Sequence, residues 1–291
     1  MKTFLIEIKN TIVATIVFGI ICCGIYPLAV YGVGQLLFNH QANGSLIVQD
    51  GKIVGSELLG QPFASDKYFI PRTSAAGTGY DASNSSGSNL SPTSKKLING
   101  TTKSIAVADK DGKITQAPDV VDYDGIKIRI IGFCDQNGIP YQLVQDDKVV
   151  EPKTFKTERG DWDQVKLITA FNDDNKPLTV KPSVLIPGDA VTSSASGLDP
   201  HISVKNAMLQ LPRVAKTRSL SEDKVKEMVA QNTDGPGLGI FGDAGVNVLK
   251  LNLALDKLAP VAPAPTAPPA AVATPDAPAA PAAPAAPEAA K

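Results

Sequence analysis

The chain has 291 residues, and its 28 basic and 29 acidic side chains give a formal net charge of −1. That length suffices for one sizeable domain with appendages or for two small domains. Proteins that bind nucleic acid need a clustered basic surface, which this balance does not supply, so nucleic acid is excluded as a partner. The three cysteines cannot form a disulfide framework.

The first predicted element is a membrane span at residues 11–38. No charged residue occurs between Thr11 and Phe38. Apolar runs longer than roughly 18 residues are typical of transmembrane helices. A cleavable signal peptide has a shorter apolar core of about 7–15 residues that ends in a small-residue cleavage site. We therefore expect a retained transmembrane helix.

The flanking charges predict the orientation of this helix. Lys2 and Lys9 precede it, whereas the segment that follows, NHQANGSLIVQD, contains no Lys or Arg. Positive residues favour the cytoplasmic side of a span. Residues 1–10 are thus expected in the cytoplasm and everything after the span outside it.

One face of the span carries small side chains. Thr11, Thr15, Gly19 and Cys23 recur every four residues, and such a stripe lets another helix approach closely within lipid. Chance is the alternative, because small residues are common in such helices. Pro27 is predicted to kink the helix beyond the stripe.

After the span, residues 39–100 are expected to form the first part of a globular α+β domain. Asp50 and Gly51 lie between two short apolar runs, which is the usual signal for a two-residue hairpin. The following stretch is rich in Ser, Gly and Asn from Ser65 to Ile98, so it should be mainly loop.

Residues 101–181 are expected to form a small β-rich insertion. The segments GIKIRIIGF (125–133) and YQLVQDDKVV (141–150) read as strands with polar turns between them, and the lone tryptophan, Trp162, follows.

Residues 182–258 are expected to complete the globular domain. A helix is predicted around Ala207, Leu211 and Val214, bent or interrupted at Pro212. A second helix follows, with Ser219 and Glu222 spaced as a capping box. The segment VNVLKLNLALDKL fits both strand and helix spacing. From Ala259 to Lys291 the chain is almost entirely Ala and Pro, which predicts a disordered tail.

The stretch SASGLDPHIS contains one of the two histidines. A hydrolase would need His201 as its base, but no G-x-S-x-G nucleophile elbow is present, and metal-ligand and Walker-type spacings are absent as well. The residue types match helix-capping positions instead, with Asp199 or Ser203 as the cap and Pro200 at a helix start. No catalytic and no metal-binding residue is predicted.

Four long motifs occur in the order in which the C subunit of the Kdp-type potassium-transporting P-type ATPase carries them. They are YFIPRTSAAGTGYDASNSSGSNLSPTSKKL, SASGLDPHIS, QLPRVAKTRSL and GVNVLKLNLALDKL. The N-terminal span, with YPLAVYGVGQLLF followed by NGSLI, is also similar to that family. The resemblance covers roughly residues 1–100 and 185–258, so most of 101–181 has no counterpart in it.

The resemblance implies a non-catalytic, single-pass subunit of a four-part complex in the bacterial plasma (inner) membrane that imports potassium with ATP. Its partners would be a channel-like potassium-binding subunit, a P-type subunit that hydrolyses ATP, and a small single-span subunit. The family is also described as a catalytic chaperone that raises the pump subunit's affinity for ATP. No phosphate-binding motif supports ATP contact in this chain. If such contact occurs, Gln210, Arg213 and the helix start after Asp199 are the first candidates.

The resulting hypothesis places partner contacts at two sites. The span would dock on partner helices through Thr15, Gly19 and Cys23. The globular domain would rest on the channel-like subunit through Ser88, Asn89, Asp199 and His201. The alternatives are a membrane-tethered hydrolase that uses His201 and a membrane-tethered extracytoplasmic binding module.

Overall fold

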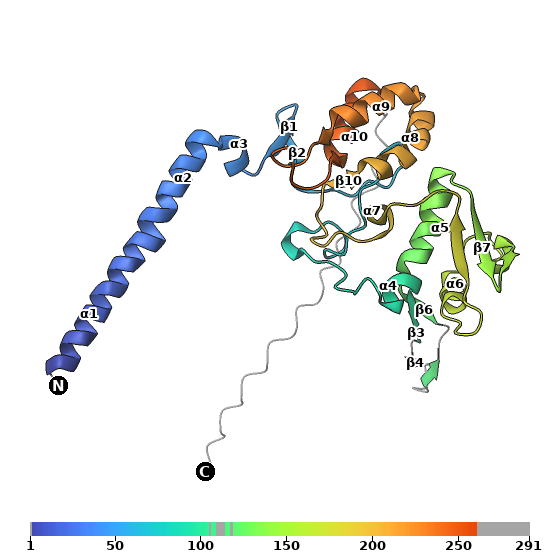
Figure 1. Cartoon of the computed structure of the whole chain (residues 1–291), viewed down its shortest axis with the longest axis horizontal. Helices are drawn as coiled ribbons and strands as arrows, with labels where there is room; N and C mark the ends of the chain where they lie inside the picture. The colour runs from blue at the N-terminus through green and yellow to red at the C-terminus, as the bar shows by residue number, and fades with distance from the viewer. Residues whose placement is uncertain (1, 105, 109–113, 117–118, 261–291) are drawn as a thin grey trace, which may run out of the picture.

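The computed structural model describes residues 2–104, 106–108, 114–116 and 119–260 (Figure 1). The predicted Ala/Pro tail lies outside the described residues from residue 261 onward. The helices are α1 (Lys2–Gly19), the π-helical η1 (Ile20–Ile25), α2 (Tyr26–Leu37), α3 (Asn39–Ala42), the 3-10 segment η2 (Ala82–Asn84), α4 (Lys95–Asn99), α5 (Gly125–Asn137), the 3-10 segment η3 (Pro152–Phe155), α6 (Gln164–Phe171), α7 (Gly188–Val191), α8 (Val204–Arg218), α9 (Glu222–Gln231) and α10 (Val248–Leu258).

The strands are short and form small antiparallel sheets. Their orders are β1-β2, β10-β12-β11, β3-β6, β4-β5 and β8-β7-β9. Their bounds are β1 (Leu46–Gln49), β2 (Lys52–Ser56), β3 (Thr101–Lys103), β4 (Ala106–Ala108), β5 (Ile114–Gln116), β6 (Val120–Tyr123), β7 (Tyr141–Gln145), β8 (Lys148–Val150), β9 (Thr179–Pro182), β10 (His201–Ser203), β11 (Thr233–Asp234) and β12 (Gly245–Asn247). The α+β fold class expected from the sequence is confirmed.

The N-terminal apolar helix is also confirmed. It runs without interruption from Thr3 to Leu37, and none of its most apolar window is buried against the rest of the chain. Figure 1 shows it as a rod that stands away from the globular domain. Its 35 residues exceed the roughly 20 that a bilayer core requires, so its length and composition suit a membrane span.

A π-helical segment precedes Pro27 in the apolar helix. Proline has no N–H for the carbonyl four residues earlier, and its ring crowds that carbonyl. The segment η1 ends two residues before Pro27 and replaces the usual bonds with wider ones, such as that from the Tyr26 N–H to the Ile21 carbonyl. The helix thus accommodates Pro27 by widening locally.

A short stalk, residues 38–45, connects the apolar helix to the β1-β2 hairpin. The side chains of Gln35, Asn39 and Asn43 hydrogen-bond to one another at 2.9–3.3 Å across the end of the helix. His40 in α3 lies 3.4 Å from the carboxylate of Glu57, which follows β2. The hairpin itself turns at Asp50 and Gly51, both with positive φ, as predicted.

The first hydrophobic core joins the C-terminal helices to the β10-β12-β11 sheet. Helices α8, α9 and α10 surround it at the top of Figure 1. Its buried members are Phe69, Ile202, Ala207, Leu211, Val214, Ala215, Val225, Val229, Val246, Val248, Leu251 and Leu255. Phe69 belongs to the long loop between β2 and β3, so this core also anchors that loop.

Three details of this region differ from the sequence expectations. Helix α8 continues through Pro212, so the predicted interruption is wrong. The predicted capping box is also wrong, because Ser221 caps α9 by accepting from the Lys224 N–H, while Ser219 ends α8 with a φ of 55°. The ambiguous segment contains both elements, strand β12 and then helix α10, which Asn247 caps.

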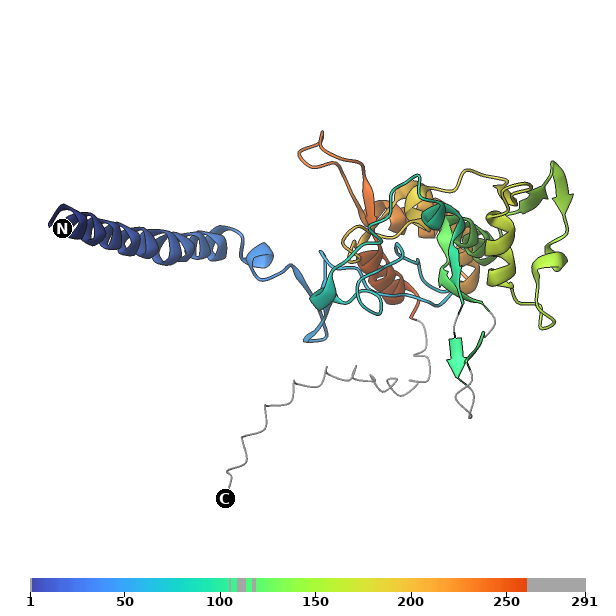
Figure 2. The same ribbon diagram turned by 90° about the horizontal axis from the view of Figure 1, so that it is seen from below.

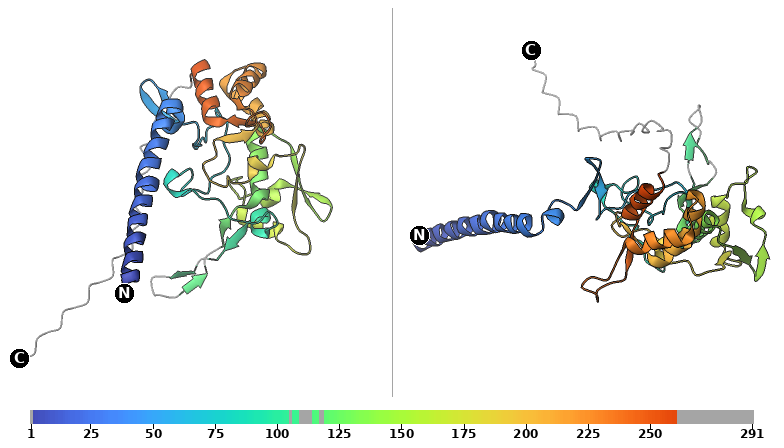
Figure 3. Two further views of the ribbon diagram at one scale, coloured as in Figure 1. Left: turned by 60° about the vertical axis from the view of Figure 1, so that its left-hand side comes forward. Right: turned by 90° about the horizontal axis from the view of Figure 1, so that it is seen from above.

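A second core lies at the end of the globular domain remote from the apolar helix (Figures 2 and 3). It gathers side chains from α5, α6 and the β8-β7-β9 sheet: Ile128, Ile131, Leu143, Phe155, Leu167, Ile168, Phe171 and Leu178. The strands predicted in residues 141–150 are confirmed as β7 and β8. The boundaries 101–181 stay a prediction.

The strand predicted at residues 125–133 is wrong, because this segment forms helix α5. Its alternating isoleucines favour a strand, but Ile128, Ile131 and Cys134 lie three residues apart on a single buried helical face. Gly138 ends the helix with a φ of 64°, and the Ile139 N–H bonds back to the Cys134 carbonyl. Packing into the second core therefore outweighs strand propensity.

Candidate functional site

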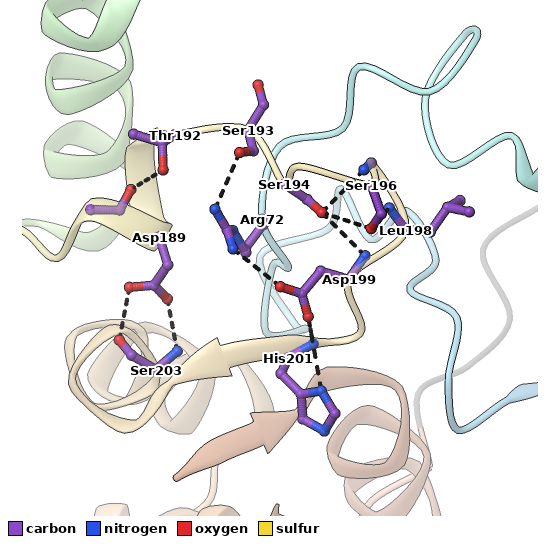
Figure 4. Close-up of polar contacts among 12 residues, drawn as sticks. Arg72, Asp189, Thr192, Ser193, Ser194, Ser196, Leu198, Asp199, His201 and Ser203 are labelled. Carbon is purple, nitrogen blue, oxygen red and sulfur yellow. Dashed lines mark hydrogen bonds and ion pairs between the residues drawn. The ribbon is translucent and has the colours of Figure 1, made fainter. Parts of the chain in front are cut away.

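The candidate site is a tight corner at residues 193–203, between α7 and α8 (Figure 4). The hydroxyl of the buried Ser194 accepts hydrogen bonds from the N–H groups of Gly197 (3.1 Å) and Asp199 (3.4 Å). A single serine thus satisfies two backbone donors and fixes the turn that presents Asp199 and His201.

The Ser-, Gly- and Asn-rich loop packs directly on this corner. Thr73 pairs with Ser193 in a parallel bridge, and the Ser86 N–H bonds to the Ser196 carbonyl at 3.0 Å. Gly197 has a φ of +70°, and a Cβ there would lie 2.6 Å from the Ser86 carbonyl oxygen. The loop approaches so closely that only glycine fits at this point of the corner.

Arg72 joins the loop to the corner electrostatically. Its guanidinium lies 3.1 Å from an Asp199 carboxylate oxygen and donates to the Ser193 carbonyl at 3.2 Å. The Tyr80 hydroxyl donates to the Arg72 carbonyl, and burial, followed by the nearby Asp199 charge, raises the pKa of Tyr80. No local sequence pattern marks Arg72, because its partner is 127 residues away.

His201 lies between two carboxylates on the edge of the three-stranded sheet. Its Nε2 is 2.8 Å from Asp234 Oδ2, while its Nδ1 is 3.9 Å from Asp199 Oδ1. The other Asp199 contact is a bond from the His201 backbone N–H at 2.9 Å. In the described part of the chain, no serine, threonine or cysteine side chain hydrogen-bonds to this ring.

The structure assigns the helix-capping role in this stretch to Ser203. Ser203 is the N-cap of α8 and accepts from the Asn206 N–H at 3.1 Å, whereas Asp199 caps no helix and Pro200 precedes strand β10. Asp189 adds a second carboxylate to this helix start, where it accepts from the Ser203 N–H at 2.7 Å. No local sequence pattern marks Asp189 as a residue of this site.

Ser88 and Asn89 lie just beyond the contact between the loop and the corner. A Cβ on Gly87 would lie 2.6 Å from the Ala195 carbonyl oxygen, so the chain touches the corner one residue earlier. Ser88 is half-buried, and Asn89 is exposed with a φ of 52°. The structure therefore brings this pair and the corner into one continuous loop layer.

Gln210 and Arg213 lie elsewhere, buried under the loop. Gln210 accepts from the Ile70 N–H at 2.8 Å and donates to the Ile70 carbonyl at 2.9 Å. Arg213 donates to the carbonyls of Asp66 (2.6 Å) and Tyr68 (3.0 Å), and burial lowers its pKa. Both side chains hold the loop in place; nucleotide contact at these residues stays a prediction.

The small-residue stripe of the apolar helix is open to a neighbour. The Thr15 hydroxyl donates to the Thr11 carbonyl at 2.8 Å, and nothing lies within 4 Å of a Cβ placed on Gly19. In an α-helix, residues four apart drift slowly around the helix in one direction, because four residues exceed one turn. In a π-helix they drift in the opposite direction, because one turn is wider. Cys23 lies in η1, so the π-helical segment offsets the drift and keeps Cys23 close to the face of the stripe. Docking by this face stays a prediction.

Within the described ranges, no group of three or more His, Cys, Asp or Glu side chains is arranged to hold a metal ion.

Comparison with known proteins gives a consistent result over most of the chain. A family described as KdpC, the c chain of the K+-transporting ATPase, matches residues 8–124 and 162–257. The expectation that most of 101–181 has no counterpart in the family is therefore wrong, because only residues 125–161 of that stretch lie outside the match. A potassium-transporting ATPase KdpC subunit from Mycobacterium bovis (strain BCG / Pasteur 1173P2) is 40% identical over 243 residues, which is 84% of this chain and 94% of that protein. A KdpC subunit from Koribacter versatilis (strain Ellin345) is 34% identical over 260 residues, which is 89% of this chain and 97% of that protein.

Proposed function

The chain belongs to the KdpC family and is a subunit of a potassium-import ATPase, and on this premise we propose that it acts without catalysis to hold the complex together. The observation that carries the proposal is the match over most of the chain, combined with an apolar helix whose most apolar window is not buried by any other described part of the chain. A helix that only anchored a soluble domain would have no use for a small-residue face.

We assign the partner contacts to two places. Thr15, Gly19 and Cys23 let a partner helix approach within the membrane, where close backbone contact replaces the hydrophobic driving force. The surface formed by the loop at Asn89 and the corner at His201 then contacts the channel-like subunit on the outer side of the membrane. The P-type subunit and the small single-span subunit complete the assembly.

The proposed orientation places the globular domain outside the cytoplasm. Lys2 and Lys9 supply the positive flank on the N-terminal side of the helix, and the stalk after Leu37 carries none. His201 in this arrangement is a structural group, since its ring bonds to Asp234 and orders the corner.

ATP contact at Gln210 and Arg213 is the part of the family resemblance that the geometry supports least. A nucleotide there would have to break the bonds that hold residues 66–70. The start of α8 already carries the Asp189 carboxylate, which would repel a phosphate. The proposal therefore leaves ATP binding to the P-type subunit.

The test is a substitution in the stripe, read out by assembly. Gly19→Leu should reduce recovery of the other subunits with this chain after mild detergent extraction, because the bulky side chain prevents close helix approach. Gly32→Leu is the matched control, since Gly32 has equally open surroundings but lies outside the four-residue series. Equal recovery for both variants, with membrane insertion intact, would contradict docking through this face.

A further inference from the structure

The loop between β11 and β12 carries the most exposed apolar group of the globular domain among the described residues. We call residues 236–241 the apolar knuckle. Leu238, Ile240 and Phe241 are 91%, 77% and 66% exposed. Figures 2 and 3 show this loop projecting well beyond the body of the domain. Large apolar side chains gathered at a projecting tip are typical of an interaction site.

The knuckle has a defined fold of its own. Gly237 and Phe241 exchange backbone hydrogen bonds at 2.7 and 2.9 Å, and the Gly239 N–H bonds to the Pro236 carbonyl at 2.9 Å. Below it, β11 pairs with β12, and the Asn247 N–H reaches the Asn232 carbonyl at 3.0 Å. A closed turn on a paired base presents its side chains in one arrangement, which lowers the entropy cost of binding.

Leu238 adds an independent indication. Its φ of 52° lies in the left-handed region, which disfavours every residue with a Cβ relative to glycine. Its side chain is almost fully exposed, so it returns nothing to the fold by packing. Folding alone would favour glycine at this position. A leucine here carries a conformational cost without a packing gain, which points to a role in contact with something outside the chain.

The base of the knuckle adjoins the corner described above. Strand β12 lies between β10, which carries His201, and β11, which carries Asp234, and His201 Nε2 is 2.8 Å from Asp234 Oδ2. The corner and the knuckle thus extend from the same three-stranded sheet.

The charges beside the knuckle decide among possible occupants. Residues 233–247 contain two acidic residues, Asp243 and Asp234, and no Lys or Arg. One oxygen of Asp234 bonds to the His201 ring. Apolar segments that insert into anionic bilayer surfaces carry basic flanks instead. Two copies meeting through this loop would bring their own acidic flanks together. The composition fits an apolar socket with a basic rim.

We propose that the apolar knuckle is the anchor that seats the globular domain in an apolar socket with a basic rim on a neighbouring subunit of the complex. This inference rests on the proposed function, because it requires that the chain assembles with other subunits. Ile240 and Phe241 supply buried area at the centre of the contact, and the acidic flanks meet its rim.

The experiment compares three variants of the full chain, co-expressed with the other subunits and purified by a tag on this chain. Leu238→Gly removes a side chain while relieving its backbone, so its unfolding midpoint should equal or exceed that of the wild type. Phe241→Ser removes the aromatic group. Val149→Ser is the matched control, because Val149 is 65% exposed but lies on β8 in the second core region.

We expect both knuckle variants to recover the other subunits about tenfold less well, as is typical for the loss of a central apolar anchor, and the control to recover them normally. A photoreactive benzoylphenylalanine in place of Ile240 should cross-link to one of the co-purified subunits. Normal recovery by both knuckle variants, or cross-linking only to phospholipid or to a second copy of this chain, overturns the inference. If the wild type itself recovers no subunits, the proposed function fails together with it.

Discussion

The amide clamp of Gln210 gives a direct test of what orders the long loop. Gln210 is 1% exposed, and its side chain bonds to both the N–H and the carbonyl of Ile70. Gln210→Ala would leave these two partly buried backbone groups without their side-chain partners. A fully buried unsatisfied group costs about 1–3 kcal/mol, so about 2–6 kcal/mol is the upper range for the two together. We expect a loss of about 2–4 kcal/mol in the free energy of unfolding, because water can enter the vacated space and bond to one of them.

The assay is urea unfolding of the full chain in detergent, followed by circular dichroism. Limited trypsin digestion supplies a second readout, since a loosened loop should be cut sooner after Lys67 and Arg72. Gln231→Ala is the control, because Gln231 is exposed near the end of α9 and its loss should cost less than about 0.5 kcal/mol. If Gln210→Ala costs no more than this control and digestion is unchanged, the clamp does not hold the loop.

Two further predictions concern the corner and the ion pair between Glu57 and Lys250. Gly197→Ala should destabilise the protein by about 1–3 kcal/mol, because it combines a positive φ with a Cβ only 2.6 Å from the Ser86 carbonyl; thermal unfolding beside Gly188→Ala, whose surroundings are open, checks this, and equal midpoints would contradict it. The hydrogen bond from Lys250 lowers the pKa of Glu57 below 4.5, so the folded state binds this proton less readily than the unfolded chain does. The Glu57 contribution to stability should be complete above its unfolded pKa and lost as the pH falls through its lower folded pKa. Urea unfolding between pH 6 and pH 3 should therefore show a shallower acid decline for Glu57→Gln, and parallel curves would refute the ion pair.

The sequence predicts well those elements whose signals are local. The uncharged run of the apolar helix and the Asp50-Gly51 turn each specify their structure without help from distant residues. Pro212 is the opposite case. A proline inside a helix costs about 3 kcal/mol. Burial of Leu211 and Val214 in the first core returns about 1.5–3 kcal/mol for each side chain, which is enough to carry the helix through.

The candidate site was only partly predictable for a similar reason. Asp199 and His201 stand out in the sequence because they occur together in a short polar motif. Arg72 and Asp234, the residues that bond to them, lie 127 and 33 positions away, and no local pattern links such pairs. Gln210 and Arg213 were singled out, but their buried bonds to the loop became visible only with the fold.

Docking of the apolar helix and seating of the knuckle are coupled in these proposals, because a short stalk joins the helix to the globular domain. Hydrogen bonds among the side-chain amides of Gln35, Asn39 and Asn43 connect the end of the apolar helix to the residues just before β1. Once the helix docks in the membrane, the knuckle is confined near its socket, and the second contact becomes effectively intramolecular. Two individually weak contacts then give stable assembly, and loss of either one should appear mainly as faster release from the complex. The same linkage would favour keeping the membrane helix and the globular domain in one chain, because each contact then strengthens the other.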